Sequence, residues 1–504
     1  MAISVNETET KYEAGPDAVL PKFDTLPDVT SAQGPDVQEL VAEYFDTEDL
    51  RLLAAGITLR RRTGGTDAGW HLKLPAAPGS REEIRLPPGR ADRGVPAELA
   101  NLVQARTRGA PLLPVAAITT LRRVTTLVGP DGASLAEVAD DSVRAVPAQG
   151  DPDEWREVEV ELTGGDRKLL AAADDLLLLS GLQRSRRSAK LERVLGQLSQ
   201  PLAGCAKLRP SSSAADVIGA YLRSQAEALK WLDPRVRRAE PDSLHQMRVA
   251  SRRLRSALRS FGLVVSRLQT DHLTAELRWL SGVLGEARDA EVQAERLDEH
   301  VRQTAAEELL GPVAAHIQAH NAKATATSVK AVSAALKSAR YYTLLDELDQ
   351  LIASLPPGPA AGEAARKALP AAVSRTYRKT RRRMRRALEA PAGPAREVAL
   401  HQARKAAKQA RYAAEAVAPV LGHDAARFGK RMKELQTVLG DHQDTVVGRQ
   451  LARRLGISAQ RAGESAFSYG LFYGRDACEG ARLQAKAAAA WQKASRRRYR
   501  RWLP

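Results

Sequence analysis

The spacing of polar and apolar residues divides the chain into two parts, with the change near residue 210. Up to about residue 200, charged side chains alternate with apolar or hydroxyl-bearing ones, for example in residues 7–11 and 157–161. A period of two places every second side chain on the same face of a β-strand, so these segments predict strands with one charged face. The segments are short and separated by turns, which favours an antiparallel sheet that curls or closes into a barrel.

After residue 214, apolar residues recur at the helical period instead. In residues 244–261, Leu244, Met247 and Leu254 fall on one stripe that faces a core. A second stripe of the same segment is basic, with steps of 3, 4, 3 and 4 between His245, Arg248, Arg252, Arg255 and Arg259. Such steps align side chains along one face of a helix. The segment therefore predicts a helix with one apolar and one cationic side.

This helical pattern occurs twice. Residues 400–417 repeat the pattern with His401, Arg404, Lys408, Arg411 and Glu415 in the same register, and Lys405 is a further basic residue of this segment. His245 and His401 are 156 residues apart, and the glycines of two further similar segments, Gly285 and Gly440, are 155 residues apart. Two separate segments with almost the same offset indicate an internal duplication. We expect two helical half-bundles that present positive charge to a shared partner.

The two copies are not identical. Lys408 and Glu415 stand in the second copy where Arg252 and Arg259 stand in the first. The second stripe is therefore expected to bind an anion more weakly. A third basic segment, residues 375–386, carries eight basic residues in twelve positions, and for this segment alone a solvated surface is as good an interpretation as a binding surface.

A length of 504 residues exceeds one ordinary core and predicts a multidomain α+β protein. We expect an N-terminal barrel domain of eight antiparallel strands in residues 1–200. A linker rich in Pro, Gly and Ser follows in residues 201–213. The rest, residues 214–504, is expected to be an all-α domain with repeats at about 214–354 and 364–504.

Charge is distributed unevenly between these parts. The whole chain has a net charge of +17, but residues 1–213 carry −5 and the remainder +22. Such asymmetry indicates that the helical part binds a polyanion and that the barrel has its own carboxylate chemistry. Nucleic acid is the general alternative for a basic domain, but aromatic residues make up only 4% of the chain, which disfavours a reader of single strands by base stacking.

Cysteine usage and hydropathy indicate the compartment. Cys205 and Cys478 are far apart and lack metal-ligand spacing, so neither a disulfide framework nor a zinc site is expected. The first residues are acidic where a secretory signal needs positive charge and then apolar residues, and no run reaches the roughly 18 apolar residues that span a bilayer. We expect a cytoplasmic protein without membrane contacts.

The charged strand faces suggest a chemistry for the barrel. A single motif such as Glu-x-Glu-x-Lys is most often a solvated face, but several strands here carry charge on one side. A closed barrel of about eight strands can direct those faces inward around one ligand. Carboxylates there can hold Mg²⁺ or Mn²⁺ through oxygen, while Arg and Lys bind phosphate oxygens. Together they predict a phosphoryl-transfer site in which water is the nucleophile.

Residues 3 to about 195 resemble the CYTH domain, the fold shared by class IV adenylyl cyclases, thiamine triphosphatases and bacterial inorganic triphosphatases. The resemblance is carried in order by Glu7-Thr8-Glu9-Thr10-Lys11, Tyr44-Phe45-Asp46-Thr47, Leu59-Arg60-Arg61-Arg62, Trp70 to Lys73, Glu157-Val158-Glu159 and Lys190. It implies a triphosphate tunnel, an eight-stranded antiparallel barrel with a metal-dependent triphosphatase site.

The resemblance also implies a role for individual residues. The implied metal ligands are Glu7, Glu9, Glu157 and Glu159, with Asp140 at the family's downstream acidic position. The implied triphosphate-binding residues are Lys11, Arg60, Arg62, Lys73, one of Arg122 and Arg123, and Lys190, which closes the site. For the strand at 81–85, alternation places either Arg81 and Glu83 or Glu82 alone inside, and we favour Arg81 and Glu83.

The segment from about residue 214 to the end resembles the CHAD domain, a duplicated all-helical module. The resemblance is carried by the two His-containing basic stripes and by the two Leu-Gly…Asp segments near Gly285 and Gly440. It implies two helical bundles around a basic channel that binds inorganic polyphosphate, with the residues of both stripes as contacts. Together, the two resemblances cover almost the whole chain.

Our main hypothesis is a metal-dependent triphosphatase fused to a polyphosphate-binding module, acting on inorganic triphosphate or short polyphosphate. The alternatives are a non-catalytic polyphosphate-binding protein of polyphosphate granules, and an adenylyl cyclase or thiamine triphosphatase built on the same barrel. Neither a specific nucleic acid nor a membrane is expected as a partner.

Overall fold

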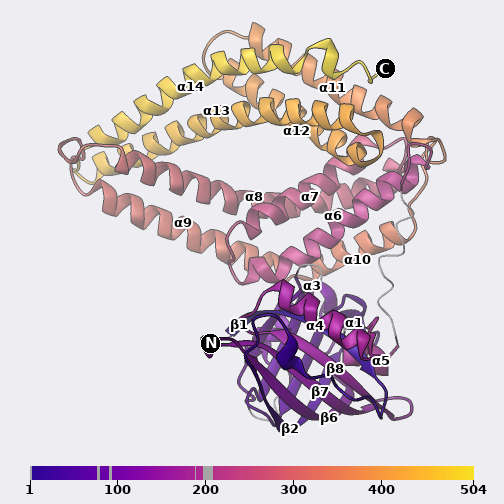
Figure 1. Cartoon of the computed structure of the whole chain (residues 1–504). Helices are drawn as coiled ribbons and strands as arrows, with labels where there is room; N and C mark the ends of the chain where they lie inside the picture. The colour runs from indigo at the N-terminus through magenta and orange to yellow at the C-terminus, as the bar shows by residue number, and fades with distance from the viewer. Residues whose placement is uncertain (1–2, 77–79, 90–93, 188, 197–207) are drawn as a thin grey trace. The chain divides into compact units, whose positions relative to one another are not determined.

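The computed structural model describes residues 3–76, 80–89, 94–187, 189–196 and 208–504 (Figure 1). The chain forms two compact units, residues 1–204 and 205–504. Part of the predicted linker, residues 201–207, lies outside the described residues, as does Cys205. No helix in the described part of the chain combines the length and apolar character needed to cross a membrane.

The first unit is a closed antiparallel barrel. Its strands are β1 (Ile3–Ala14), β2 (Ser31–Asp46), β3 (Thr58–Thr63), β4 (Gly69–Pro75), β5 (Ser80–Leu86), β6 (Leu113–Val128), β7 (Ser134–Pro147) and β8 (Asp153–Leu162). Their order is β5-β4-β3-β2-β6-β7-β8-β1, and β1 pairs back to β5. A short further strand, β9 (Gln183–Arg184), pairs with β1. The described residues thus confirm the predicted eight-stranded barrel.

Short helices accompany these strands. They are α1 (Arg51–Ala54), α2 (Ala97–Leu102), α3 (Gln104–Thr107), α4 (Arg167–Leu179) and α5 (Lys190–Val194), with a 3-10 turn η1 (Phe23–Thr25). Helix α4 covers the outside of β1 and β8. Its Leu169 and Leu177 belong to the same buried cluster as Tyr12, Val158 and Val160. Because these apolar residues alternate with the charged ones, covering their side with α4 leaves the charged side facing the interior.

The second unit is entirely helical (Figure 1). Its helices are α6 (Ala214–Arg237), α7 (Ser243–Ser260), α8 (Arg267–Arg302), α9 (Val313–Leu336), α10 (Ala339–Ala353), α11 (Ala365–Glu389), α12 (Pro394–Leu421), α13 (His423–Arg461) and α14 (Phe467–Ala494). Two 3-10 turns, η3 (Ala306–Glu308) and η4 (Arg497–Tyr499), complete it. Consecutive helices pack side by side within α6–α9 and within α11–α14, and α7 packs on α12. The two predicted basic helices, α7 and α12, therefore lie next to each other.

Candidate functional site

Strand pairing determines which charged residues face the interior of the barrel. Residues directly opposite in an antiparallel pair lie on the same face of the sheet. Lys11 of β1 is opposite Glu159 of β8 and forms an ion pair with it. Lys73 of β4 donates a hydrogen bond to Glu7 of β1 at 2.5 Å, although β5 separates the two strands. A contact between strands that are not neighbours crosses the interior, so this face lines the lumen.

The same register extends around the barrel. Lys73 is opposite Glu83, and Arg60 is opposite both His71 and Tyr44. Across β6, β7 and β8, Arg122 is opposite Asp141, which is opposite Glu157. The lumen side of the barrel thus receives Glu7, Glu9, Lys11, Tyr44, Arg60, Arg62, His71, Lys73, Arg81, Glu83, Arg85, Arg122, Asp141, Glu157, Glu159 and Glu161.

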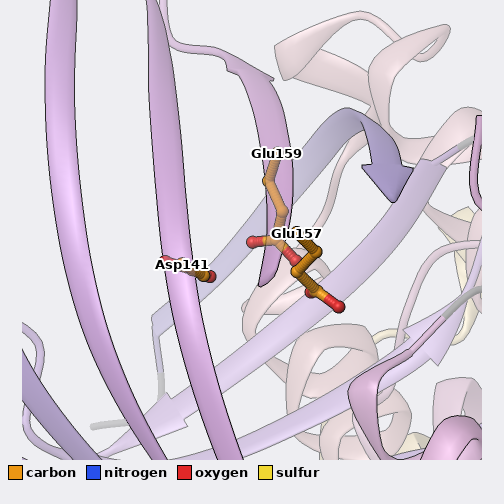
Figure 2. A group of neighbouring side chains, drawn as sticks. All are labelled: Asp141, Glu157 and Glu159. Carbon is orange, nitrogen blue, oxygen red and sulfur yellow. The ribbon is translucent and has the colours of Figure 1, made fainter. Parts of the chain in front are cut away.

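Three carboxylates form a compact cluster in this lumen. Asp141 of β7 and Glu157 and Glu159 of β8 each place an oxygen within 4.8 Å of the others, and Figure 2 shows their side chains pointing toward one another. The ammonium group of Lys190, which α5 brings to the cluster, lies 2.9, 2.7 and 2.8 Å from Asp141, Glu157 and Glu159 respectively. The cluster therefore surrounds a cationic side chain, and an oxygen-only set of this kind suits a hard divalent metal ion.

Neighbouring cations keep Asp141 and Glu159 ionised. Burial alone would raise the pKa of Glu159, but Lys11, Lys190 and Arg122 hold that pKa well below its ordinary value. Burial likewise opposes ionisation of Asp141, whose pKa is nevertheless lowered by Lys190 and Arg122. Arg122 donates to Asp141 at 2.6 Å and to Glu159 at 2.7 Å. The cluster is thus negative at neutral pH.

Guanidinium groups gather in the same lumen. Burial, followed by the nearby charges of Arg60 and Arg122, lowers the pKa of Arg62 to about 9. Arg60 donates to the hydroxyl of Tyr44 at 3.3 Å, and Arg62 pairs with Asp67. The Nε atoms of Arg60 and Arg62 are buried without a hydrogen-bond partner among the described residues. Crowded cations with free donors form a site for a polyanion.

Glu83 and His71 support this basic group. The Nδ1 atom of His71 lies 2.9 Å from Glu83, and its Nε2 atom lies 2.8 Å from the carbonyl oxygen of Asp67. Glu83 also pairs with Arg85 and lies 3.8 Å from Arg60. Burial would raise the pKa of Glu83, but its hydrogen bond to His71 and the charges of Lys73 and Arg60 hold it far below its usual range. Glu83 is therefore positioned to orient the cations.

Two sequence-based assignments require correction. Asp140 faces outward, where Arg156 donates to it at 2.8 and 3.0 Å. Arg123 is opposite Asp140 and shares that outer face, so Arg122 is the member of its pair that enters the lumen. The reason is alternation along a strand: neighbouring residues face opposite sides, so Asp141 and not Asp140 faces the lumen.

Sequence reasoning also omitted several lumen residues. They are Asp141, Tyr44, His71, Arg85 and Glu161. Glu161 shares the face of Glu157 and Glu159 by simple alternation, and His71 shares that of Lys73, so the sequence contained a signal for both. Burial, and next the charge of Glu7, raises the pKa of Glu161 to about 7.

The helical unit contains a cationic cavity of about 610 Å³. Residues from both basic stripes line it: His245, Arg248, Arg252, Arg255, Arg259, His401, Arg404, Lys405 and Lys408. Arg411 is not part of the lining, because its Nε donates to Glu415 at 2.5 Å. Lys379 and Arg383, from the basic segment of α11, line the cavity as well, together with Arg288, Asp289 and Asp444.

Like charges crowd this cavity. Burial, then Arg252 and Arg404, lowers the pKa of Lys408 well below its ordinary value. Burial, then Arg248, lowers the pKa of Arg252 to about 10. Burial also lowers the pKa of both His245 and His401, which leaves both imidazoles mostly neutral at pH 7. An anion in the cavity would relieve this repulsion.

The internal duplication repeats one detail of the cavity wall. A Cβ on Gly285 would lie 3.6 Å from Arg248, and a Cβ on Gly440 would lie 3.3 Å from Arg404. Each glycine thus packs against the arginine of its own repeat. The Nε of both arginines is buried without a hydrogen-bond partner in the described part of the chain, although Arg248 also pairs with Asp289 at 3.0 Å. Each repeat therefore offers a free donor.

Comparison with known proteins adds the following findings. A model of the CYTH domain matches residues 6–193, and a model of the CHAD domain matches residues 220–453. Two uncharacterized proteins from two strains of Mycobacterium tuberculosis are each 38% identical over 506 residues, which covers 97% of this chain and 96% of theirs.

Two solved structures are similar as well. PptA from Streptomyces chartreusis is 21% identical with a TM-score of 0.47, and the match covers 56% of this chain and 100% of PptA. The CHAD domain from the plant Ricinus communis is 24% identical with a TM-score of 0.44, and the match covers 60% of this chain and 96% of that domain.

Proposed function

Since the chain belongs to the family of proteins that join a CYTH domain to a CHAD domain, we propose that its barrel hydrolyses inorganic triphosphate or a short polyphosphate with the help of a divalent metal ion. We propose further that its helical unit binds polyphosphate. The observation that carries the first proposal is that one closed lumen holds both a carboxylate cluster and a group of partly unpaired guanidinium groups. Phosphoryl transfer requires both of these elements.

The residues present fit a magnesium or manganese ion. Asp141, Glu157 and Glu159 provide carboxylate oxygens from adjacent strands, and no thiol or imidazole joins that cluster within the described residues. Such a donor set favours hard cations. When bound, the ion would supply positive charge at phosphoryl oxygens and lower the pKa of water. Glu9, on the same lumen face and 3.3 Å from Lys11, is a further acidic group near this cluster.

The remaining lumen residues position the substrate. Arg60, Arg62 and Arg122 present forked donors that match phosphate oxygens, and Lys73 adds a point charge. Lys190 is held by all three clustered carboxylates, so it is positioned to bridge the acidic cluster and a bound anion. The barrel wall limits the entry of water into the lumen. Electrostatic contacts are stronger where water is excluded.

Two aromatic side chains on the lumen side contact neighbouring charged groups. The hydroxyl of Tyr44 accepts from Arg60, and the indole nitrogen of Trp155 donates to Glu157 at 2.6 Å. The guanidinium of Arg193 covers the Trp155 ring at 4.6 Å. One face of the Trp155 ring is therefore covered by a guanidinium group.

The test is phosphate release from triphosphate, thiamine triphosphate and ATP, each with Mg²⁺ or Mn²⁺. We expect triphosphate to be the preferred substrate and EDTA to abolish turnover. Formation of cyclic AMP as the main product from ATP would instead establish a cyclase, and binding of triphosphate without release of phosphate would establish a binding protein.

For the helical unit, the supporting observation is that one cavity receives cations from α7 and α12 together. A linear chain of phosphates has one negative charge per unit and is thin enough to lie between packed helices. We therefore propose polyphosphate as its ligand, in preference to a wide nucleic-acid duplex.

A further inference from the structure

A second cationic cavity adjoins the first in the helical unit. It has a volume of about 490 Å³. Its wall shares Arg259, Lys379 and Gln409 with the cavity of about 610 Å³ between α7 and α12, which we call the central cavity. Arg267 and Arg375 line it as well, against one exposed carboxylate, that of Asp271. Four basic residues therefore surround a space that shares part of its wall with the proposed polyphosphate cavity.

The boundary between the two cavities is built from polar side chains of three helices. Lys379 of α11 donates to the side-chain oxygen of Gln409 of α12 at 3.1 Å, and Gln409 donates to the hydroxyl of Ser260 of α7 at 3.2 Å. Gln409 is uncharged, so its hydrogen bond with Lys379 does not neutralise the charge of Lys379. A phosphate at the boundary would find an uncompensated ammonium group.

The charges along this path repel one another. Burial, then Arg259 and Arg383, lowers the pKa of Lys379, and burial, then Arg267 and Arg378, lowers that of Arg375. In the described part of the helical unit, neither Lys379 nor Arg375 forms an ion pair with a carboxylate. An anion that bridged the two cavities would relieve this repulsion, which is the condition for favourable binding of a polyanion.

The duplication supplies an internal comparison. Arg259 of the first repeat corresponds to Glu415 of the second, at the same offset of 156 residues. Glu415 accepts from Arg411 at 2.5 Å and from Arg253 at 3.1 Å. Beside Glu415, the two arginines that could continue the path, Arg411 and Arg253, are thus already paired with a carboxylate. The cationic path leaves the central cavity on the Arg259 side.

We propose that a linear polyphosphate extends from the central cavity past Arg259 and Lys379 into the second cavity, and that the helical unit thereby selects long chains over short ones. This inference rests on the proposed binding of polyphosphate by that unit. Its ligand class is an unbranched polyanion long enough to occupy both cavities, whereas a triphosphate fills only one.

The test compares chain lengths in the full-length protein. Arg267→Gln combined with Arg375→Gln removes two charges that line the second cavity and not the first. Arg381→Gln combined with Arg386→Gln removes two exposed charges of α11 and is the matched control. Affinity is measured for tripolyphosphate and for long-chain polyphosphate over a series of salt concentrations. All variants keep an intact barrel, so its contribution cancels in the comparison.

We expect the cavity variant to bind the long chain roughly 10- to 30-fold more weakly near 0.1 M salt. The slope of log affinity against log salt concentration should be smaller in magnitude by about 1 to 1.5, because two lost phosphate contacts release fewer counterions. Its affinity for tripolyphosphate should be unchanged. The charge-retaining variant, Arg267→Lys with Arg375→Lys, should recover most of the long-chain affinity, which separates lost charge from damaged packing.

Two results would overturn the inference: an equal loss for both chain lengths, or a long-chain loss no larger than that of the control. If the unaltered protein binds no polyphosphate of any length beyond what the barrel accounts for, the proposed function of the helical unit fails instead. The two failures are therefore distinguishable.

Discussion

Asp140 and Asp141 are adjacent in sequence but have opposite surroundings. Asp141 is fully buried in the lumen beside Lys190 and Arg122, whereas Asp140 pairs with Arg156 on the outer face. At the scale of single residues, the function of a carboxylate in this barrel depends on which face of the strand carries it. This pair offers a matched test of the metal site.

We predict that Asp141→Asn reduces triphosphatase turnover by at least about 10²-fold, the scale for losing one preorganised electrostatic contact. Asp140→Asn should keep turnover within a few-fold of the unaltered protein, because its carboxylate faces away from the lumen. It should nevertheless lower the free energy of unfolding by about 1 to 2 kcal/mol, through the lost hydrogen bonds to Arg156. Steady-state kinetics and denaturant unfolding measure the two effects. Similar kinetics for both variants would argue against a lumen site.

The guanidinium of Arg62 provides a second test at this scale. Arg62→Lys keeps the charge but replaces a planar fork by a single ammonium group, which cannot hold two phosphate oxygens at once. We expect kcat/KM for triphosphate to fall by about tenfold or more, mostly through a higher KM. A silent substitution would show that Arg62 serves only its ion pair with Asp67.

At the scale of secondary structure elements, α4 holds the outer side of β1 through one buried carboxylate. Asp174 accepts from the Tyr12 hydroxyl at 2.9 Å and pairs with Arg184 of β9. Its hydrogen bonds, first from Arg184 and then from Tyr12, lower its pKa against the opposing effect of burial. Packing of α4 is what directs the charged faces of β1 and β8 inward, so this contact supports the site indirectly.

The lowered pKa of Asp174 has a defined consequence for stability. A carboxyl group whose pKa is lower in the folded state stabilises that state above its unfolded pKa, and this contribution is lost as the pH falls through the folded pKa. We predict that Asp174→Asn lowers the free energy of unfolding of the barrel at pH 7 by about 1 to 3 kcal/mol. The difference from the unaltered protein should shrink below about pH 4. A difference that is independent of pH would contradict this role for the ionised carboxylate.

The paired helices α7 and α12 provide a test of the central cavity. Replacing Arg248, Arg252 and Arg255 together by Ala removes three cavity charges. We expect polyphosphate affinity to fall by about 10²-fold near 0.1 M salt, because three fewer counterions are released. The matched control replaces Arg381, Arg385 and Arg386, which are exposed on α11; Arg383 is unsuitable because it lines the cavity. Equal losses in both variants would reduce the cavity to a general basic surface.

At the scale of the whole molecule, the two units divide the charge between them. The part before residue 214 is net negative and the helical part strongly positive, so each is suited to a different aspect of phosphate chemistry: one to a metal ion with a short substrate, the other to a long polyanion. In the proposed function, the helical unit binds the polymer and the barrel acts on short inorganic phosphates.

This division predicts ligand preference for the intact protein. At equal salt concentration, polyphosphate should compete effectively against double-stranded DNA, since a thin chain can enter a cavity between helices that a rigid duplex cannot. Competition binding with labelled polyphosphate and unlabelled duplex checks this expectation. Displacement by duplex at equal phosphate concentration would mean that the positive charge acts only as an outer surface.

The sequence alone determined the periodic features of this protein. Alternation predicted the charged faces around Glu7 and Glu159, and the 156-residue offset predicted that α7 and α12 are copies of one basic helix. It also predicted the barrel followed by helices, because the period of side chains along a strand or helix is a local property of the backbone.

The tertiary structure decided which of two faces is the functional one and which charges remain free. The choice of Asp141 over Asp140 required the pairing of β7 with β8. Lys379 became a cavity residue only because α11 packs beside α7 and α12, and Arg411 was removed from the cavity by Glu415. A local period gives the relative orientation of side chains on one element. Only the packing of elements far apart in sequence determines which orientation is buried and which charges are neutralised.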